Sequence, residues 1–574
     1  MAFDNGKIVV RFATEAPEQA AGPLTWAQRY MWDIITSLAP LDEHLNLKLI
    51  VPIPAGPSIG DIAKAIAALI ERHASLRTRY FVDDDLEPYQ IEMSSGELEL
   101  PLHTSVAGEN PEQSSAELAK FLTGRSFDLT QELPVRAGIC SHENGSTFIV
   151  LAFSHIVIDG WGMEVLKSDL KSLLSRGRDP GKTPGHRPIE QAAFENSESR
   201  RHIEINALAH WRSRLHKFPR TMFAMHPVAA ASPRYWRGVL SSPALGLGVT
   251  ALARRYRISS NSVLLAALSL YIGYYMGIDY CALNVQVSNR LGRDLRQAVG
   301  NFFQDVPVVF NIDQYCFEAT AKSAHAEVIR SALHARCSPA KVRKLRDEID
   351  EELGTRIIID TNVNTIQLPT AQPPSVPEFT QDLSAVLSEL RSRTKFSWYE
   401  KRAVEGVKML VIASPFVANW ISLLADTTYL PPDQVSALLL GIEELIIHIA
   451  TVGDEPMTPV QRSSLVPFHR GPEWRKLGAS WTDLEATASM ISDRSGVSRD
   501  AIHLAIGNEL IAYMVGHMPL DKFRHLPRDC FDALVQDENV ALPDRFVLLE
   551  ESPMSYPSDD GWRHLPVLET AALR

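Results

Sequence analysis

The chain has 574 residues, of which 45% are hydrophobic and 22% charged, and its formal net charge is −12. Because a typical domain has ~100–200 residues, this length predicts two or three globular units with a large buried core. The composition excludes a disordered, collagenous or membrane-embedded chain, and a negative charge without a basic stripe argues against nucleic-acid binding.

Apolar strand-like runs alternate with amphipathic helical patterns along the chain, which is typical of an α/β protein. Ser58, with Asp61 three residues later, forms a capping box, the pattern of a helix start. The expected helices are Ile62–His73, Ser114–Thr123, Ile203–Lys217, Ser259–Tyr275 and Pro432–Val452. The expected strands are Thr147–Phe153, Tyr280–Val287, Arg356–Thr361 and Val407–Ser414.

Three segments rich in proline, glycine or charge suggest boundaries: Arg176–Pro188, the proline-rich loop Leu368–Pro377, and Glu455–Pro472. Such segments are typical of loops and linkers between units. We therefore predict an N-terminal lobe at residues 1–180, a second lobe at 181–460 and a small α/β tail at 470–574.

The five cysteines are scattered and form no CxxC pair, so the sequence predicts neither a disulfide framework nor a zinc ribbon, and it fits a reducing compartment. The first residues, MAFDNGKIVVRF, lack the apolar region of a secretory signal. The longest apolar run, Val263–Met276, is shorter than the ~20 residues that cross a membrane and predicts a buried helix. We therefore expect a cytoplasmic protein with no membrane partner.

Two well-known motifs are matched only in part. Gly56–Gly60 has the GxSxG pattern of a nucleophile elbow, but Ser58 follows prolines instead of a strand and is better explained as a helix cap. Gly177–Thr183 resembles a phosphate-binding loop, but it is one residue short and no strand precedes it, so we interpret it as linker. The patterns HExxH and GxGxxG are absent, and we predict no metal site.

The segment Thr147–Gly162 is the most informative, because an apolar strand ends in Ser154-His155 and Asp159-Gly160 follows. A neutral imidazole is the commonest general base near pH 7, and the end of a buried strand fixes its ring. Asp159 can hold the loop or orient the ring, and Gly160 permits a tight turn into the next helix. By itself, this pattern also fits a structural histidine at a strand end.

This segment resembles the HHxxxDG hallmark of the condensation domains of nonribosomal peptide synthetases, which are related to acyltransferases with a chloramphenicol-acetyltransferase-like fold. His155 aligns with the second histidine, the one considered catalytic, and Ser154 replaces the first. Further family motifs follow in the expected order, so the resemblance covers roughly residues 8 to 452. They are Leu24–Gln28 (LTxxQ), Arg72–Thr78 (RHExLRT), His210–Arg212 (YW-R), Val287–Arg290 (NR), Val299–Val308 (iGxFvNtlPv) and Ile421–Thr427 (the last core strand).

The resemblance implies two α/β lobes, each with α+β two-layer architecture, that form a V with a central tunnel. It also implies a structural role for Asp159, paired with Arg290 from the other lobe, and for Ser154 and Gly160, which support the loop. A paired buried aspartate stays ionised.

Four residues are candidates for the tunnel wall: Trp161, Asn289, Phe302 and Gln304. We expect Asn289 and Phe302 to pack instead of react. Gln304-Asp305 stands where the family usually has Asn-Thr, so acceptor specificity is not transferred to this chain.

The tail weakly resembles the small C-terminal subdomain of adenylation enzymes, through Gly478–Met490, Glu509–Val515 and Leu542–Val547. Those enzymes use a lysine in a P-x-G-K loop, whereas here Trp562 follows Gly561. We therefore expect a tail that is inert in ATP chemistry and serves docking or structure. An unrelated α/β appendage is the alternative.

The resemblance implies a free-standing condensation enzyme of natural-product, including antibiotic, biosynthesis. It would join an acyl thioester on the phosphopantetheine arm of a carrier protein to an amine or hydroxyl nucleophile, with His155 as general base or oxyanion stabiliser. No cofactor is expected on the chain itself, since the arm belongs to the carrier protein. A coenzyme A-dependent acyltransferase of the same fold and a non-catalytic condensation-like scaffold remain open alternatives.

Overall fold

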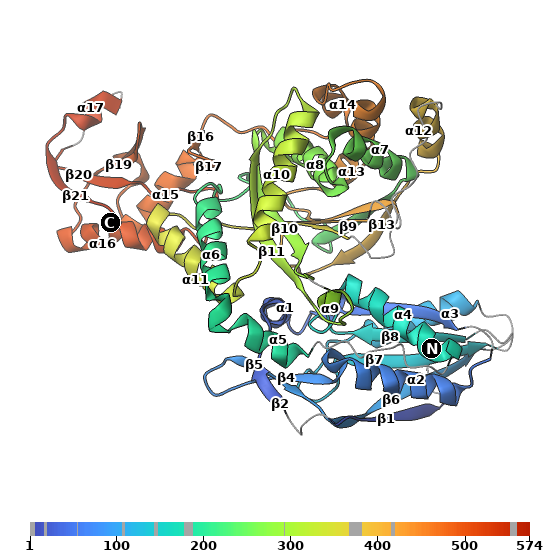
Figure 1. Ribbon diagram of the computed structural model, residues 1–574. Helices are drawn as coiled ribbons and strands as arrows, with labels where there is room; N and C mark the ends of the chain where they lie inside the picture. The colour runs from blue at the N-terminus through green and yellow to red at the C-terminus, as the bar shows by residue number, and fades with distance from the viewer. Residues whose placement is uncertain are drawn as a thin grey trace.

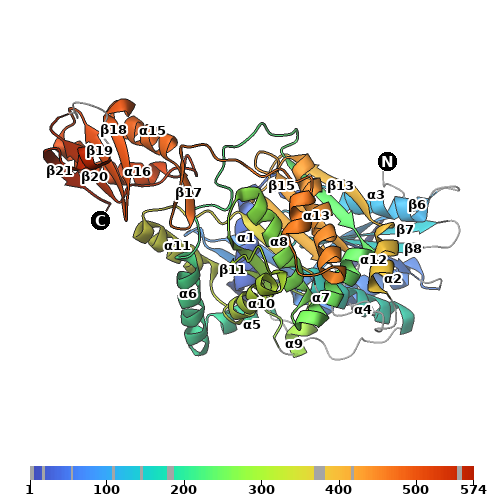
Figure 2. The ribbon, with the colours of Figure 1, turned by 90° about the horizontal axis from the view of Figure 1, so that it is seen from above.

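The computed structural model describes residues 6–15, 20–53, 56–105, 110–142, 147–176, 187–291, 293–366, 382–414, 419–551 and 559–573. The phosphate-loop look-alike Gly177–Thr183 and the proline-rich loop Leu368–Pro377 lie outside these residues. Two lobes that mix helices and strands lie one above the other, and a smaller unit projects from the side of the upper lobe (Figures 1 and 2). The predicted α/β fold class is confirmed.

The first lobe is built on a five-stranded sheet with the order β1-β6-β7-β8-β3. Neighbouring strands are antiparallel except β6 and β7, which are parallel. The strands are β1 (Lys7–Ala13), β3 (Leu47–Ile53), β6 (Ser95–Ser105), β7 (Val135–His142) and β8 (Thr147–Phe153). A separate three-stranded sheet contains β2 (Ala20–Pro23), β5 (Pro88–Glu92) and β4 (Thr78–Val82).

Strand β8 is buried on both faces, which explains its uninterrupted apolar sequence. Ile149, Leu151 and Phe153 join the main core of the lobe, together with α2 (Ile59–Arg72) and α4 (Gly160–Arg176). Val150 and Ala152 face α3 (Pro111–Thr123) on the other side. The strand predicted at Thr147–Phe153 is therefore confirmed, and it delivers the residues after Phe153 to the edge of a rigid core.

The helix cap predicted at Ser58 is also confirmed. The Ser58 hydroxyl accepts the Asp61 backbone N–H at 3.2 Å, and the Asp61 carboxylate accepts the Ser58 N–H at 3.0 Å. Helix α2 begins at Ile59, three residues before the predicted start. Ser58 is thus held in a capping box and is not a nucleophile on a strand-to-helix turn.

The second lobe contains a seven-stranded sheet with the order β11-β10-β12-β14-β15-β9-β13. Its strands are β9 (Tyr235–Ser241), β10 (Tyr280–Ser288), β11 (Phe303–Asn311), β12 (Thr361–Thr365), β13 (Lys395–Arg402), β14 (Met409–Ser414) and β15 (Trp420–Asp426). Its helices are α6 (Arg201–Leu215), α7 (Pro243–Tyr256), α8 (Ser260–Met276), α9 (Arg293–Arg296), α10 (Phe317–Leu333), α11 (Pro339–Leu353), α12 (Leu383–Arg391), α13 (Pro432–Thr451) and α14 (Met457–Arg462). Helix α5 (Pro188–Glu195) packs instead against β2 of the first lobe.

The two faces of this sheet differ in polarity, as the period of two along a strand allows. On β10, β11 and β12, Val285, Val306 and Val363 join the hydrophobic core with α7, α8, α10 and α13. The alternate positions carry Asn284, Asp305 and their neighbours on the other face, which looks toward the first lobe. That polar face is the floor of the cavity described below.

The strand predicted at Arg356–Thr361 is wrong in position, because β12 only begins at Thr361. Upstream, Ile358 donates one hydrogen bond to the Arg220 carbonyl. From Thr361 onward the chain lies between β10 and β14, where Asn362 pairs with both strands. The apolar, β-branched sequence indicates strand propensity, but the position of the pairing partners sets the strand.

Two long apolar helices lie within the second lobe. Helix α8, which contains the predicted buried run Val263–Met276, is buried along nearly its whole length, so this prediction is confirmed. Helix α13 is long and apolar enough to cross a membrane, but 67% of its apolar window is buried inside the protein, as in the core helix of a soluble domain. This helix is therefore weak evidence for a membrane span.

The tail has its own small core around Phe523, Leu526 and Phe546. A four-stranded sheet, β18 (Ile502–Ile506), β19 (Leu510–Val515), β20 (Arg545–Leu549) and β21 (Val567–Ala571), packs with α15 (Leu484–Ser495) and α16 (Leu520–Ala533). The hairpin β16 (Trp474–Leu477) and β17 (Ser480–Asp483) precedes them, and α17 (Asp559–Arg563) lies before β21. The relationship of this unit to adenylation enzymes stays a prediction.

The tail is fixed to the second lobe by a buried arginine, Arg220. Its guanidinium donates to the carbonyls of Glu538 at 3.0 Å and Asp537 at 2.8 Å, and also to that of Leu534. Each of these carbonyls belongs to the turn after α16. The Arg220 side chain of the second lobe thus holds the C-terminal end of α16 in place.

Candidate active site between the lobes

His155 lies in the tight turn that follows β8. The turn is closed by a hydrogen bond from the Val157 N–H to the Ser154 carbonyl, and the Ser154 N–H donates to Pro134. Nδ1 of His155 lies 3.0 Å from the Ile158 carbonyl. When Nδ1 donates this hydrogen bond, the lone pair of the neutral ring is on Nε2.

The environment of His155 favours its neutral form. Burial lowers the pKa of the imidazole below its usual 6.5 because it disfavours the charged ring. The ring also packs at 5.3 Å, centroid to centroid, against Phe303 at the start of β11. A basic imidazole is therefore held in one orientation at neutral pH.

Asp159 is occupied by structural contacts. Its Oδ1 accepts the Gly162 N–H and an Arg290 Nη2 hydrogen, each at 2.7 Å, and its Oδ2 accepts the Phe302 N–H at 3.2 Å. The first of these contacts lies in the opening turn of α4, the helix that Gly160 begins. Asp159 therefore organises the loop around His155 and is not among the residues that line the two cavities between the lobes.

Arg290 reaches Asp159 from the second lobe and is almost fully buried, with 2% of its side chain exposed. It also donates to the carbonyls of Leu295 and Ala298, each at 2.7 Å, and of Gly300 at 2.9 Å. The pair that the sequence places at Asp159 and Arg290 is present, and it folds the segment 290–302 onto the first lobe.

Further contacts that the sequence did not indicate join this segment to the first lobe. Asn301 donates to the His155 carbonyl at 3.0 Å, and Ser75 donates to the Val299 carbonyl at 2.9 Å. The Val299 side chain belongs to the hydrophobic core of the first lobe, although the rest of its segment belongs to the second. The loop around His155 is thus completed by residues of both lobes.

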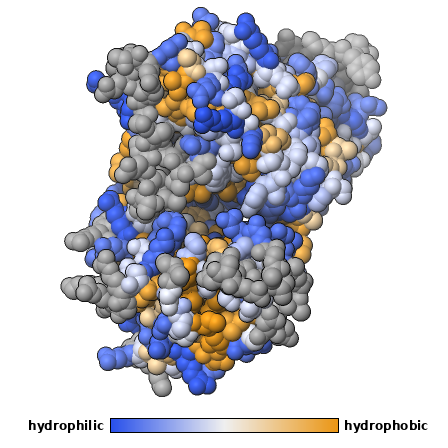
Figure 3. All heavy atoms as spheres, turned by 90° about the vertical axis from the view of Figure 1, so that its right-hand side faces the viewer, coloured by the Kyte–Doolittle hydropathy of each residue, from blue (hydrophilic) through white to orange (hydrophobic). Residues whose placement is uncertain are grey.

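A cavity of about 530 Å³ lies between the lobes and is lined by His155, Phe303 and the polar face of the seven-stranded sheet. Figure 3 shows the surface hollowed where the two lobes meet. A second cavity, of about 370 Å³, is lined by α5, Asn289 and Phe302.

Gln304 lines both cavities. Its amide accepts from Asn289 Nδ2 at 2.7 Å and donates to the Cys337 carbonyl at 2.8 Å. Gln304 therefore lies where the two cavities approach each other. Trp161 lines neither of the two cavities described here, because its indole N–H donates to the Arg296 carbonyl at 2.8 Å in α9.

A buried carboxylate, Asp305, shares the larger cavity with His155. Burial raises the pKa of Asp305 to about 6, and the Tyr30 hydroxyl donates a hydrogen bond to its Oδ2. Burial and the neighbouring Asp305 in turn raise the pKa of Tyr30, so that hydroxyl keeps its proton. In the sequence, the only sign of Asp305 is that Gln304-Asp305 replaces the usual Asn-Thr of the family. No sequence pattern points to Tyr30, which lies on α1 (Trp26–Leu38).

The described residues contain one group with the spacing of metal ligands, His226, Glu473 and Asp483, and none of them lines either cavity. Asp483 caps α15 by accepting the Ala486 N–H at 3.0 Å through Oδ1, and its Oδ2 lies 3.2 Å from His226 Nε2.

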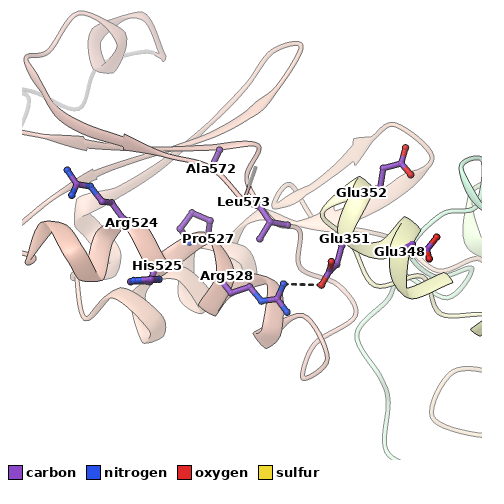
Figure 4. A pocket seen from close by; sticks show the side chains of 9 residues that line it. All are labelled: Glu348, Glu351, Glu352, Arg524, His525, Pro527, Arg528, Ala572 and Leu573. Atoms are coloured by element: carbon purple, nitrogen blue, oxygen red, sulfur yellow. Dashed lines mark hydrogen bonds and ion pairs between the residues drawn. The ribbon is translucent and has the colours of Figure 1, made fainter. Parts of the chain in front are cut away.

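A third cavity, of about 360 Å³, lies between α11 and α16 at the junction with the tail (Figure 4). Arg528 of α16 reaches across it to Glu351 of α11 at 3.1 Å. The cavity is ringed by further charged side chains, among them Glu348, Glu352 and Arg524, and His155 is not part of its wall. It lies at the junction of two units and is not an extension of the site.

Comparison with known proteins identifies the family. The condensation domain model matches residues 18–380, which is more than half of the chain. The chain belongs to the condensation domain family. The match includes the His155 turn, Arg290 and the three strands β10, β11 and β12 that carry the cavity floor, and it leaves the tail outside.

Similar curated proteins are large biosynthetic synthetases. The chain is 30% identical over 188 residues (33% of this chain, 2% of the relative) to the probable non-canonical nonribosomal peptide synthetase CymA of Salinispora arenicola. It is 26% identical over 315 residues (52% and 24%) to the AMB antimetabolite synthetase AmbB of Pseudomonas aeruginosa. The chain therefore spans only a small part of these relatives.

Solved condensation domains share the fold. The first condensation domain of the calcium-dependent antibiotic synthetase, in complex with a substrate analogue, matches with a TM-score of 0.57 and 15% identity over 78% of this chain and all of that one. The starter condensation domain of rhizomide synthetase RzmA, solved as a variant with C8-CoA, matches with a TM-score of 0.59 and 15% identity over 78% of this chain and 98% of that one. The predicted two-lobed condensation fold is thereby confirmed.

Proposed function

We propose that the chain transfers an acyl group from a thioester to an amine or hydroxyl nucleophile, with His155 as the catalytic base. The observation that carries this proposal is the anchored neutral imidazole: Nδ1 lies 3.0 Å from the Ile158 carbonyl, and the ring lines the cavity between the lobes. A general base must keep its lone pair free at working pH, and both the hydrogen bond and the lowered pKa serve that purpose.

In the proposed step, the nucleophile attacks the thioester carbonyl carbon and its proton passes to Nε2 of His155. The tetrahedral intermediate then expels the thiol as the C–S bond breaks, and His155 returns the proton to the leaving sulfur. The products are an amide or ester and a free thiol. The imidazolium formed midway also stabilises the oxyanion electrostatically, and holding both substrates in one cavity supplies much of the rate by orientation.

The proposed acyl donor is a thioester on the phosphopantetheine arm of a carrier protein, in a cytoplasmic pathway of natural-product, including antibiotic, biosynthesis. Membership of the condensation family and similarity to nonribosomal peptide synthetases support this donor.

A free coenzyme A thioester is the second candidate donor. Helix α11 places Arg343 and Arg346 at the larger cavity, and guanidinium groups of this kind bind phosphates well. The solved RzmA starter domain carries C8-CoA, which is a property of that protein. A scaffold without catalysis is less favoured, because His155 lines a cavity and is not sealed in the core.

Intact-mass analysis tests the proposal. Acyl-loaded carrier protein, or free acyl coenzyme A, is mixed with candidate amines and alcohols and with wild-type protein, His155→Ala or the control His202→Ala. His202 is exposed on α6, so its loss controls for removal of a surface imidazole. We expect acyl transfer with the wild type and with His202→Ala, and its loss with His155→Ala. Full transfer by His155→Ala would remove the base role, and consumption of coenzyme A thioester alone would select the second donor.

A further inference from the structure

The floor of the cavity that His155 lines carries a row of polar side chains on three neighbouring strands. Asp305 on β11 pairs in register with Gln286 on β10, and Asn284, two residues before Gln286, pairs with Asn362 on β12. Side chains two residues apart on a strand share a face, and paired residues on neighbouring strands lie side by side. All four side chains line the same cavity.

Three oxygen atoms in this row have no hydrogen-bond donor in the described part of the chain: Oδ1 of Asp305, Asn284 and Asn362. Asp305 and Asn284 are each only 9% exposed. A buried acceptor without a donor is costly, so native structures nearly always satisfy such atoms with protein, water or ligand. Three such acceptors on one cavity wall are well matched by a single group that donates several hydrogen bonds.

The negative charge of the Asp305 carboxylate favours a positively charged hydrogen-bond donor over a neutral one. Among the described residues Asp305 has no ion-pair partner. Its Oδ2 accepts a hydrogen bond from the neutral Tyr30 hydroxyl, and the neutral side chains of Tyr30, Gln286 and Asn284 lower its pKa less than burial raises it. Four arginines line the same cavity, and among the described residues none of them forms an ion pair with Asp305: Arg343 pairs with Asp33, Arg237 with Glu400, and Arg402 with Glu400 and Glu405. A buried carboxylate without a paired cation is stabilised when a positively charged group binds beside it.

We propose that Asp305, Asn284 and Asn362 form a subsite for a cationic nitrogen group, an ammonium or guanidinium, on one of the substrates. The carboxylate neutralises the charge through Oδ1, and the two amide oxygens accept the remaining N–H groups. The inference rests on the proposed function, because it assigns a basic substrate to the cavity that His155 serves. Asp305 is then a specificity-determining residue that binds substrate and takes no proton from the nucleophile.

The first test measures binding without chemistry. The full chain is titrated with n-pentylammonium, n-butylguanidinium and neutral n-pentanol while its melting temperature is recorded. We expect the cations to stabilise the wild type and His155→Ala, and n-pentanol to have little effect. Equal stabilisation by n-pentanol, or none by any of the probes, would overturn the proposal. Comparing the two cations decides between the ammonium and the guanidinium.

The second test uses Asp305→Asn, which keeps an oxygen for the Tyr30 hydroxyl and removes only the charge. We expect this variant to fold with unchanged or higher melting temperature and to lose the stabilisation by cations. With basic substrates its kcat/KM should fall by about 10- to 100-fold, as the loss of a hydrogen bond to a charged group implies, whereas neutral isosteres should react as with the wild type. The exposed Glu198→Gln controls for the change in net charge. Cation-dependent stabilisation that survives in Asp305→Asn would assign the cation to another site.

The two proposals fail in different ways. If the cations bind at Asp305 but no thioester is consumed, the subsite stands and the acyl-transfer function falls. If neutral substrates react as well as basic ones and no cation binds, the function stands and the subsite falls.

Discussion

Arg290→Ala removes the guanidinium that joins the two lobes beside the turn that carries His155. The side chain makes five hydrogen bonds: two to the Asp159 carboxylate, at 2.7 and 3.3 Å, and three to the carbonyls of Leu295, Ala298 and Gly300. After truncation, Asp159 keeps only backbone donors for a carboxylate that is 11% exposed. The three carbonyls lose the guanidinium at the same time, although that of Gly300 still accepts the Asp159 N–H at 3.1 Å and that of Leu295 the Ala298 N–H at 3.4 Å.

Removing one partner of a buried ion pair costs about 3–5 kcal/mol in free energy of unfolding. For a unit of about 150–250 residues, each kcal/mol lowers the melting temperature by about 2–4 °C. We therefore expect the first calorimetric transition of Arg290→Ala to fall by about 6–20 °C. Because the segment 290–302 also carries Asn301 onto the His155 carbonyl, acyl-transfer activity should fall as well.

The matched control is Arg201→Ala, which removes an exposed arginine whose pair with Glu198 contributes at most about 1 kcal/mol. In the double variant Asp159→Ala/Arg290→Ala, the loss should be smaller than the sum of the two single losses, because no carboxylate is left unpaired. A decrease for Arg290→Ala no larger than that for Arg201→Ala, or strict additivity in the double variant, would refute the reasoning.

Three further predictions follow from the same contacts. Burial lowers the pKa of His155 below 6.5, so its basic form persists as the pH falls through 6.5. The acid limb of a kcat/KM profile should therefore lie below pH 6.5. An acid limb at or above pH 6.5 would contradict the assignment of His155 as the base. Gly162→Ala places a methyl group 3.0 Å from Ile158 Cγ1 and 3.3 Å from Arg290 Nη2. The free energy of unfolding measured by urea titration should therefore fall by about 1–3 kcal/mol. An unchanged midpoint would show that the turn relaxes to accept the methyl group. Arg220→Ala removes the guanidinium that donates to the carbonyls after α16. Limited proteolysis should therefore release the tail faster than in the wild type, while acyl transfer by the two lobes persists. Proteolysis at the wild-type rate would show that other contacts hold the tail.

The elements that sequence predicted well are those with a local cause. Thr147–Phe153 is apolar at successive positions because helices cover both faces of β8, and Ser58 caps α2 through contacts that span three residues. The strand at Arg356–Thr361 was misplaced because its position depends on where β10 and β14 lie, which no local pattern encodes.

The candidate site shows the same division. His155, Asp159 and Arg290 were found because a recognisable motif carries them. Asn301, Asp305 and Tyr30 were missed because they reach the site from separate elements, and only the fold brings them together. Polar residues in β10 and β12 likewise look like ordinary alternation until the sheet aligns them on one face.

The insertion of Val299 into the core of the first lobe limits how the two lobes can move. Separating them at this end would extract a buried valine and break the ion pair of Asp159 with Arg290. An opening that keeps these contacts must therefore rotate about this point. Since displacement in a rotation is smallest at the axis, His155 would then stay close to its place while the far ends of the cavities widen.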